Sequence, residues 1–236
     1  MFSPKMTSIK ELSPSYNQED FLELKSRLKP LFEADSSKTQ TDACLKRFLR
    51  GFEDVDEACK ALLKYIKWRE DYGVDYLSND DDVMREVDTG KAIVLDFPDK
   101  SHRPIIIVTA RLHDARERDL NVITKFIIYT LECATRKCDE SIIDNICILF
   151  DLKDFSFYNM DYGFVKQLIW LLSRRFPERL GYCLLLNAPF IFSGCWAIIR
   201  LWINEVTSNK IVFIRDDNHL SEFIPLDILP NSVTTS

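Results

Sequence analysis

Residues able to bind a metal or attack a substrate are present in this chain, but their spacing does not assemble a reactive site. The three histidines, His102, His113 and His219, are scattered along the sequence. A zinc site needs paired Cys or His ligands at short spacing. The odd number of cysteines contains no C-x-x-C pair, so the pattern predicts reduced thiols on apolar faces and no metal site. They are Cys44, Cys59, Cys133, Cys138, Cys147, Cys183 and Cys195.

Motifs for nucleotide binding and for hydrolysis are absent from the sequence. Its six glycines form neither G-x-G-x-x-G nor G-K-[ST] after a predicted strand. Ser193 precedes Gly194 but lacks the earlier glycine of the G-x-S-x-G turn that carries a hydrolase nucleophile. Asp151 ends an apolar run, where some α/β enzymes place a catalytic acid; the alternative, which we favour, is that it caps the following loop. We therefore expect a binding protein that is not an enzyme and needs no cofactor.

Composition excludes further classes of protein. The 236 residues are 46% hydrophobic and carry a formal net charge of −6. The chain can therefore bury a large core, and it has no overall positive field to attract nucleic acid. The N-terminal residues contain no apolar signal segment, and no apolar run reaches the ~18 residues of a membrane span. We expect a cytoplasmic protein without a membrane span.

The first part of the chain has helical periodicity. Pro30 should end or bend the first predicted helix, and Gly51 occupies the position where a left-handed residue would end the second. Asp54 and Glu57 have the spacing of a capping box, and Gly73 should close the third helix. The predicted helices cover residues 18–32, 41–51 and 54–73.

From about residue 91 the helical period gives way to short apolar runs separated by helices. The runs are nearly continuous in Ile, Val, Leu and Phe, which predicts a mostly parallel sheet with both faces covered. We expect an α/β fold in which an N-terminal helical subdomain (17–78) precedes a sheet-containing domain with covering helices (79–230). The predicted strands are 91–97, 104–109, 145–151, 181–187 and 210–214, and the helices between them are 121–136, 161–175 and 189–204.

One predicted helix is unusual because it is apolar around nearly its whole circumference. Residues 190–203 read FIFSGCWAIIRLWI. Fourteen residues give a helix of about 21 Å, well short of the ~20 residues needed to cross a bilayer. The segment is either a buried core helix or a lid that moves between the protein interior and a membrane interface. Trp196 and Trp202 suit a lid, because tryptophan tolerates a wet boundary.

Two segments make the chain resemble the CRAL-TRIO family of lipid-transfer proteins. Residues 41–75, TDACLKRFLRG and then DVDEACKALLKYIKWREDYGVD, are similar to the family's N-terminal helical subdomain. Residues 148–214 are similar to its lipid-binding domain, with FPER, NAPF, the apolar helix and T-x-x-K-I in the family's order. The resemblance implies a sheet that floors a deep apolar pocket for one lipid and a lid helix over that pocket.

The resemblance assigns the lid to the apolar helix. Its large side chains are costly to expose to water and favourable to expose at a bilayer, so opening would be triggered by contact with a membrane. The implied lid residues are Phe190, Phe192, Trp196, Ile199 and Trp202.

The resemblance also implies residues that hold a lipid headgroup. In phosphatidylinositol-transfer members, the positions of Glu178, Thr207 and Lys210 help to hold the inositol phosphate, for which a lysine and a hydroxyl are suitable partners. Arg179 and Lys210 fall on two positions of the basic cleft with which tocopherol-carrying members bind phosphoinositides. The basic pair that follows R-F-L-R-A in phosphatidylinositol-transfer members is missing here.

The implied pocket would have an apolar lining. Phosphatidylcholine-binding members place hydroxyls on the central strand, where this chain has two isoleucines. We expect a non-enzymatic protein, cytoplasmic and peripheral at membranes, that binds and transfers or presents one hydrophobic ligand, a phospholipid such as a phosphoinositide. The candidate lining residues, each of which is otherwise ordinary core, are Phe126, Tyr129, Ile146, Ile148, Phe150, Phe155 and Phe157.

An alternative prediction is a regulatory docking module with an empty or self-filled pocket, possibly part of a larger protein. The helical face around Lys60, Lys64 and Lys67 would then bind a protein partner or an anionic membrane. The same lysines also fit a solvated helix face without a partner.

Overall fold

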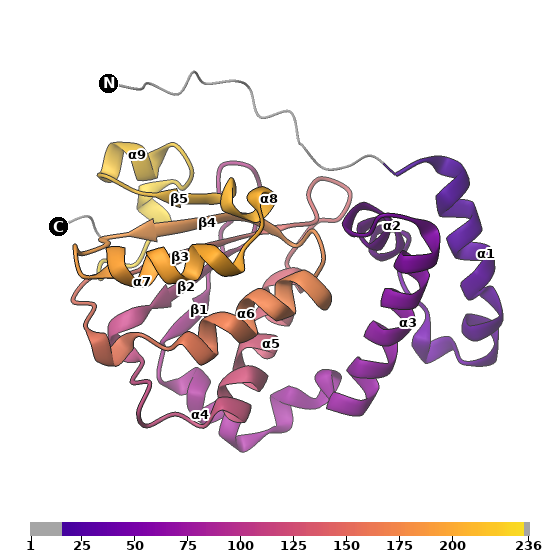
Figure 1. The fold of residues 1–236 in the computed structure, drawn as a ribbon, viewed down its shortest axis with the longest axis horizontal. Coiled ribbons are helices and arrows are strands. Elements are labelled where there is room, and N and C mark those ends of the chain that lie inside the picture. Colours follow the sequence, from indigo (N-terminus) through magenta and orange to yellow (C-terminus); the bar gives the residue numbers. More distant parts are fainter. Residues whose placement is uncertain (1–15, 234–236) are drawn as a thin grey trace. The chain divides into compact units, whose positions relative to one another are not determined.

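The computed structural model describes residues 16–233, and these divide after Ile66 into two compact units. The first unit contains α1 (Gln18–Ala34), the 3-10 turn η1 (Ser36–Lys38), α2 (Asp42–Gly51) and most of α3 (Val55–Tyr72) (Figure 1). Each helix buries one apolar face, with Leu24 and Leu28 in α1 and Phe48 in α2. The unit is helical, as its periodicity predicts.

The ends of these helices differ from the prediction at Pro30 and Gly51 and confirm it at Asp54 and Gly73. Pro30 does not end α1, which continues to Ala34 although its buried residues Phe21, Leu24 and Leu28 all precede the proline. Gly51 is the last residue of α2 and is not left-handed, because the chain leaves the helix through an extended Phe52. The Asp54 carboxylate accepts a hydrogen bond from the backbone N–H of Glu57 at 2.8 Å, which confirms the N-cap. Gly73 has a φ of 65° and closes α3.

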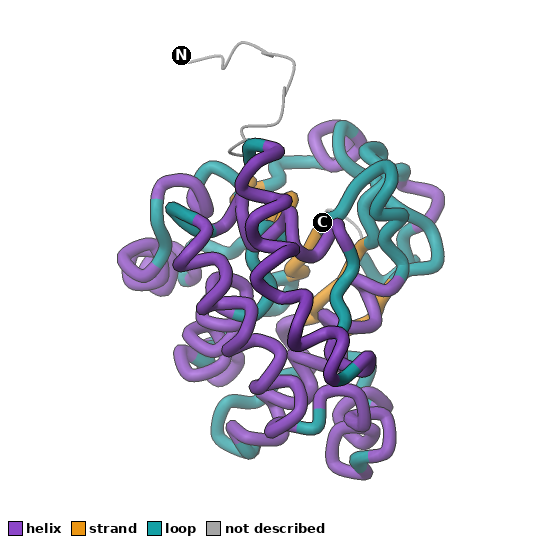
Figure 2. Tube along the Cα trace, turned by 90° about the vertical axis from the view of Figure 1, so that its right-hand side faces the viewer, coloured by secondary structure: helices purple, strands orange, loops and turns teal. Residues whose placement is uncertain are grey.

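The second unit contains a five-stranded sheet in the order β1-β2-β3-β4-β5. Only β1 is antiparallel to its neighbour, so the predicted mostly parallel sheet is confirmed. Figure 2 shows the strands, in orange, gathered in one place among helices and loops. The strands are β1 (Ala92–Val94), β2 (Ile105–Thr109), β3 (Ile146–Asp151), β4 (Leu180–Leu186) and β5 (Ile211–Phe213).

The sheet has a different covering on each face. Along β3, Ile146 and Ile148 pack into an apolar cluster with α5 (Leu120–Arg136) and α6 (Tyr162–Arg174). Cys147 and Leu149 point to the opposite face, where α9 (Asp217–Ser221) and the C-terminal segment cover the sheet. Burial on both faces is the reason that the strand sequences are continuously apolar.

The predicted apolar helix is shorter than its sequence pattern indicates. Residues 190–203 form α7 (Phe192–Ile199) and then a 3-10 turn, η5 (Arg200–Trp202), before α8 (Glu205–Ser208) leads into β5. No helix within residues 16–233 is long and apolar enough to cross a membrane. The remaining elements are α4 (Asp81–Asp88) and the 3-10 turns η2 (Val74–Asn79), η3 (Ala110–Leu112), η4 (Phe157–Asn159) and η6 (Leu226–Ile228).

Candidate functional site

An apolar cluster lies where α6 and α7 cover β4 and β5 on the same side of the sheet (Figure 1). Aromatic rings join these elements edge to face. Phe192 of α7 meets Phe155 with ring centroids 5.5 Å apart, and Trp196 meets Phe213 of β5 at 5.3 Å. Trp202 of η5 meets Tyr162 of α6 at 5.6 Å.

The predicted lid residues divide into a buried and an exposed group. Phe192 and Ile199 are buried with Cys195, one helical turn apart along α7, and Trp196 and Trp202 are half-buried. Phe190 is 92% exposed and precedes α7, so the structure does not bring it to the cluster.

The outer face of the same segment is also apolar. Ile198 is 43% exposed and Leu201 is 78% exposed. The all-round apolar pattern therefore reflects a helix with one face in the protein and one in solvent. Ile198 and Leu201 thus give α7 and η5 a partly apolar outer surface.

α6 covers the sheet loosely, in contrast to α5. Eight residues of α5 are buried, whereas Leu171 is the one buried residue of α6. Phe150 and Cys183, which belong to the central strands beneath α6, keep accessible surface although a helix lies over them. Burial nevertheless raises the pKa of the Cys183 thiol to about 12, so its surroundings are apolar.

Four of the predicted pocket-lining residues belong to one apolar cluster. Ile146 and Ile148 are buried, and Tyr129 and Phe150 pack partly buried against the same cluster. Phe126 of α5 and Phe155 are also buried. Phe157 is 68% exposed in η4, so the structure does not bring it to this interior.

The structure brings three of the four predicted headgroup residues together. Glu178 and Lys210 form an ion pair at 3.6 Å, with both side chains partly exposed. Thr207 lies beside Lys210, whose backbone N–H donates to the Thr207 carbonyl at 3.1 Å. The pairing of β4 with β5 causes this arrangement, because the backbone N–H of Cys183 donates to the Lys210 carbonyl at 2.8 Å.

Arg179 lies apart from these residues. Its guanidinium is buried and donates to the carbonyl of Asp144 at 2.6 Å and to the Glu140 carboxylate at 2.8 Å. Glu178 has a φ of 57°, in the left-handed region. The Glu178 side chain therefore faces Lys210, whereas the Arg179 side chain faces Glu140. The guanidinium of Arg179 therefore holds the loop before β3 and is already engaged.

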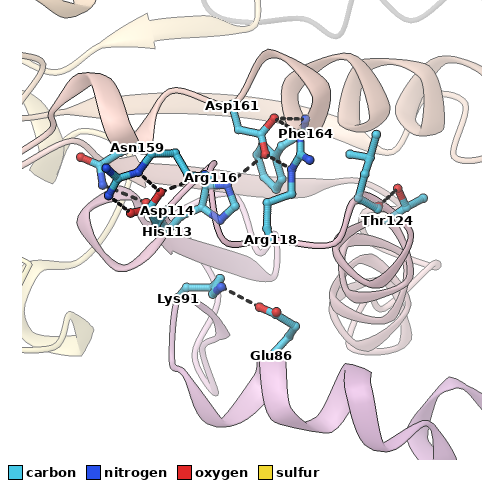
Figure 3. A network of polar contacts seen from close by, with 11 residues as sticks. Glu86, Lys91, His113, Asp114, Arg116, Arg118, Thr124, Asn159, Asp161 and Phe164 are labelled. Carbon is cyan, nitrogen blue, oxygen red and sulfur yellow. Dashed lines mark hydrogen bonds and ion pairs between the residues drawn. The ribbon is translucent and has the colours of Figure 1, made fainter.

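A buried carboxylate that the sequence analysis did not single out fixes the start of α6. Asp161 accepts hydrogen bonds from the backbone N–H of Phe164 at 3.0 Å and from Arg118 Nε at 2.6 Å and Nη2 at 3.0 Å (Figure 3). His113 Nε2 lies 3.1 Å from the same carboxylate. A Cβ at Gly163 would lie 2.9 Å from the Arg118 guanidinium, so a larger residue there would have to push this side chain aside. An aspartate at the first position of the predicted helix 161–175, with a glycine two positions later, was the available signal.

The charge state of this network follows from its contacts. Burial opposes ionisation of Asp161, but hydrogen bonds from Arg118, Phe164 and His113 outweigh it and lower its pKa to about 2. Burial lowers the pKa of His113 against the opposing effect of Asp161. At neutral pH the network therefore holds an ionised aspartate and a neutral histidine.

Asp151 at the end of β3 caps a loop, as we favoured from the sequence. Its buried carboxylate accepts a hydrogen bond from the Lys153 backbone N–H at 3.1 Å and one from the Asn187 side chain at 2.9 Å. Arg111 lies 3.3 Å from its second oxygen. Asp151 thereby joins the segments that follow β2, β3 and β4.

The fold and the cluster define a class: an α/β domain with a mostly parallel sheet and an apolar interior beneath a short helix between its last two strands. Residues 88–234 match the family model described as the CRAL/TRIO domain. The chain belongs to the CRAL-TRIO family, which confirms the resemblance. Members of this family bind and transfer lipids.

Individual relatives agree with this assignment. The chain is 34% identical over 201 residues to the phosphatidylinositol transfer protein CSR1 of Eremothecium gossypii, covering 80% of this chain and 46% of that protein. It is 32% identical over 195 residues to a CRAL-TRIO domain-containing protein of Schizosaccharomyces pombe, covering 79% and 44%. It thus spans less than half the length of these two relatives. The crystal structure of Sfh5 has the same fold, with a TM-score of 0.73, 14% identity and coverage of 88% of this chain and 83% of that one.

Proposed function

We propose that this protein binds one lipid between α6, α7 and the sheet and transfers or presents it at membranes. The observation that carries the proposal is the accessible surface kept by Phe150 and Cys183 beneath α6. Side chains that remain accessible in apolar surroundings line a space, and an apolar space of this kind accepts lipid chains.

The energetic reason for such a carrier lies in the lipid chains. A two-chain lipid in water exposes on the order of thirty methylenes at about 0.8 kcal/mol each, which is a prohibitive barrier. Exchange of one apolar environment for another is nearly neutral. The protein therefore needs to hide the chains and requires no catalytic group or cofactor.

The headgroup would lie near Lys210 and Thr207, and a phospholipid such as a phosphoinositide fits them best. An ammonium and a hydroxyl are donors for phosphate oxygens. Glu178, now 3.6 Å from Lys210, would release the lysine to a phosphate and accept hydrogen bonds from headgroup hydroxyls. The name of the relative from Eremothecium gossypii, a phosphatidylinositol transfer protein, agrees with this assignment.

Opening of α7 and η5 at a bilayer would release the lipid, and the protein would act as a cytoplasmic carrier peripheral to membranes. Phe190, Ile198 and Leu201 already face solvent. Contact with a bilayer would therefore transfer these apolar side chains out of water. Opening would then move Phe192 and Ile199 from the protein interior into a second apolar phase at little net cost.

Replacing Trp196 and Trp202 together by serine is expected to slow lipid transfer between vesicles about tenfold, equivalent to about 1.4 kcal/mol. Both rings pack against the body of the protein and would enter the bilayer interface on opening. The measurement is the initial rate of transfer of a fluorescent phospholipid. Phe97→Ser changes an exposed aromatic outside the lid and should leave the rate unchanged. Equal rates for the double variant and the unmodified protein would contradict the gating role.

Native mass spectrometry of the protein purified from cells without detergent tests the proposed function directly. A lipid carrier should show a discrete additional mass, and lipid extraction of the same sample identifies the ligand class. The bare chain mass, repeated after incubation with mixed-lipid vesicles, would contradict the carrier function and favour the docking module.

A further inference from the structure

The outward side of α6 and the adjoining turn η5 form one cationic and apolar surface. Lys166, Trp170 and Arg174 follow one another at intervals of four residues along α6, which places them on one face of the helix. All three side chains are exposed, and so are Arg200 and Leu201 of η5. We call these five residues the α6–η5 face.

Contacts between the two elements make this face continuous. The Lys166 ammonium lies 4.7 Å from the centre of the Trp202 ring, and Tyr162 meets the same ring at 5.6 Å. Trp202 is the last residue of η5. The exposed residues of α6 therefore lie beside those of η5.

The cations of this face have no acidic partner. Among the described residues, no carboxylate lies within 4.0 Å of Lys166, Arg174 or Arg200, whereas exposed cations elsewhere, such as Lys60 and Lys137, form ion pairs. Residues 162–204 contain five Lys and Arg residues and a single carboxylate, Glu178, in a chain whose net charge is −6. The positive charge is thus concentrated in the segment that carries α6, α7 and η5.

The mixture of residue types identifies the partner. Trp170 is 43% exposed and Leu201 is 78% exposed, so large apolar side chains stand among the unpaired cations. Tryptophan and leucine partition into a bilayer interface, and lysine and arginine at the same level attract anionic headgroups. We propose that the α6–η5 face docks on the surface of a membrane rich in anionic phospholipid. This inference rests on the proposed function, because docking by this face brings α7 and η5 to the bilayer.

The test compares binding of the full chain to vesicles of phosphatidylcholine alone and to vesicles that also contain phosphatidylserine. The triple variant Lys166→Gln, Arg174→Gln, Arg200→Gln should lose affinity for the anionic vesicles by about a hundredfold, since each cation near such a surface contributes roughly fivefold. Trp170→Ala should weaken binding to both kinds of vesicle.

A matched triple variant controls for net charge. Lys100→Gln, Lys137→Gln and Arg215→Gln remove three exposed cations outside residues 162–204 and should change vesicle affinity only a few-fold. Equal losses for the two triple variants would overturn the proposal. No preference of the unmodified protein for anionic vesicles would also overturn it and would favour a protein partner for this face.

Lipid loading, measured on the same samples by native mass spectrometry, separates this proposal from the carrier function. The α6–η5 triple variant should keep its bound lipid while it loses vesicle affinity. A protein that binds anionic vesicles but never carries a lipid would contradict the carrier function and leave the docking face supported.

Discussion

Replacing Cys183 by phenylalanine is expected to lower lipid loading by at least about tenfold, equivalent to about 1.4 kcal/mol of binding free energy, while the protein stays folded. The side chain faces α6, keeps accessible surface and lies in apolar surroundings. A larger apolar group should therefore fill space that the lipid chains would occupy. Lipid content by native mass spectrometry and thermal unfolding of the same samples provide the two measurements.

The neighbouring strand offers a matched control. Cys147 lies opposite Tyr182 in the register and points to the other face of the sheet, where it is fully buried. Phenylalanine there should destabilise the fold by about 1–3 kcal/mol, because a close-packed site has no room for it. A similar loss of stability for Cys183→Phe would mean that the region beneath α6 is packed core, and the proposed lipid site would then be wrong.

Replacing Asp161 is expected to destabilise the fold. Asp161→Asn should cost about 2 kcal/mol at neutral pH, as estimated from the lowering of its pKa to about 2 from the ordinary 3.8. Asp161→Ala should cost about 1 kcal/mol more, because alanine also loses the cap on the Phe164 backbone N–H that asparagine can keep. Urea unfolding at a series of pH values measures both costs.

The pH dependence has a defined sign. Because the pKa of Asp161 is lowered on folding, its ionised form contributes stability above about pH 4 that is lost as the pH falls toward 2. The difference between the unmodified protein and Asp161→Asn should therefore shrink over that range. Burial lowers the pKa of His113, so the unfolded chain takes up the histidine proton first and acid destabilises the fold through this residue as well. A difference that is constant from pH 7 to 2 would contradict the assigned network.

Much of the fold could be predicted from the sequence because the three central strands are largely buried on two faces. Strands β2, β3 and β4 lie within apolar runs that no amphipathic helix would produce. The ends of helices were harder to predict. Leu201 and Trp202 continue the apolar run of α7 but lie in a 3-10 turn, and composition does not distinguish the two kinds of helix.

The site was predictable only in part, for a different physical reason. Glu178 and Lys210 were grouped by the family resemblance, and the structure brings them together. Arg179 was grouped with Lys210 because both fall on the basic cleft of tocopherol-carrying members, yet the left-handed backbone at Glu178 sends the Arg179 side chain to Asp144 and Glu140. The partners of Asp161 lie 43 and 48 residues away in the chain, so no local spacing identifies them.

Residues 187–210 form the connection between β4 and β5. It carries α7 and η5 in its first part and Thr207 and Lys210 at its end. A ligand that contacts Lys210 would therefore restrain the same segment that the proposed opening of α7 would move. Thermodynamic linkage makes this reciprocal: the free energy by which closure strengthens ligand binding equals that by which the ligand favours closure. Amide hydrogen exchange in α7 should consequently slow when a ligand is bound. Contact with a membrane would then have to offset the free energy by which the bound headgroup favours the closed form.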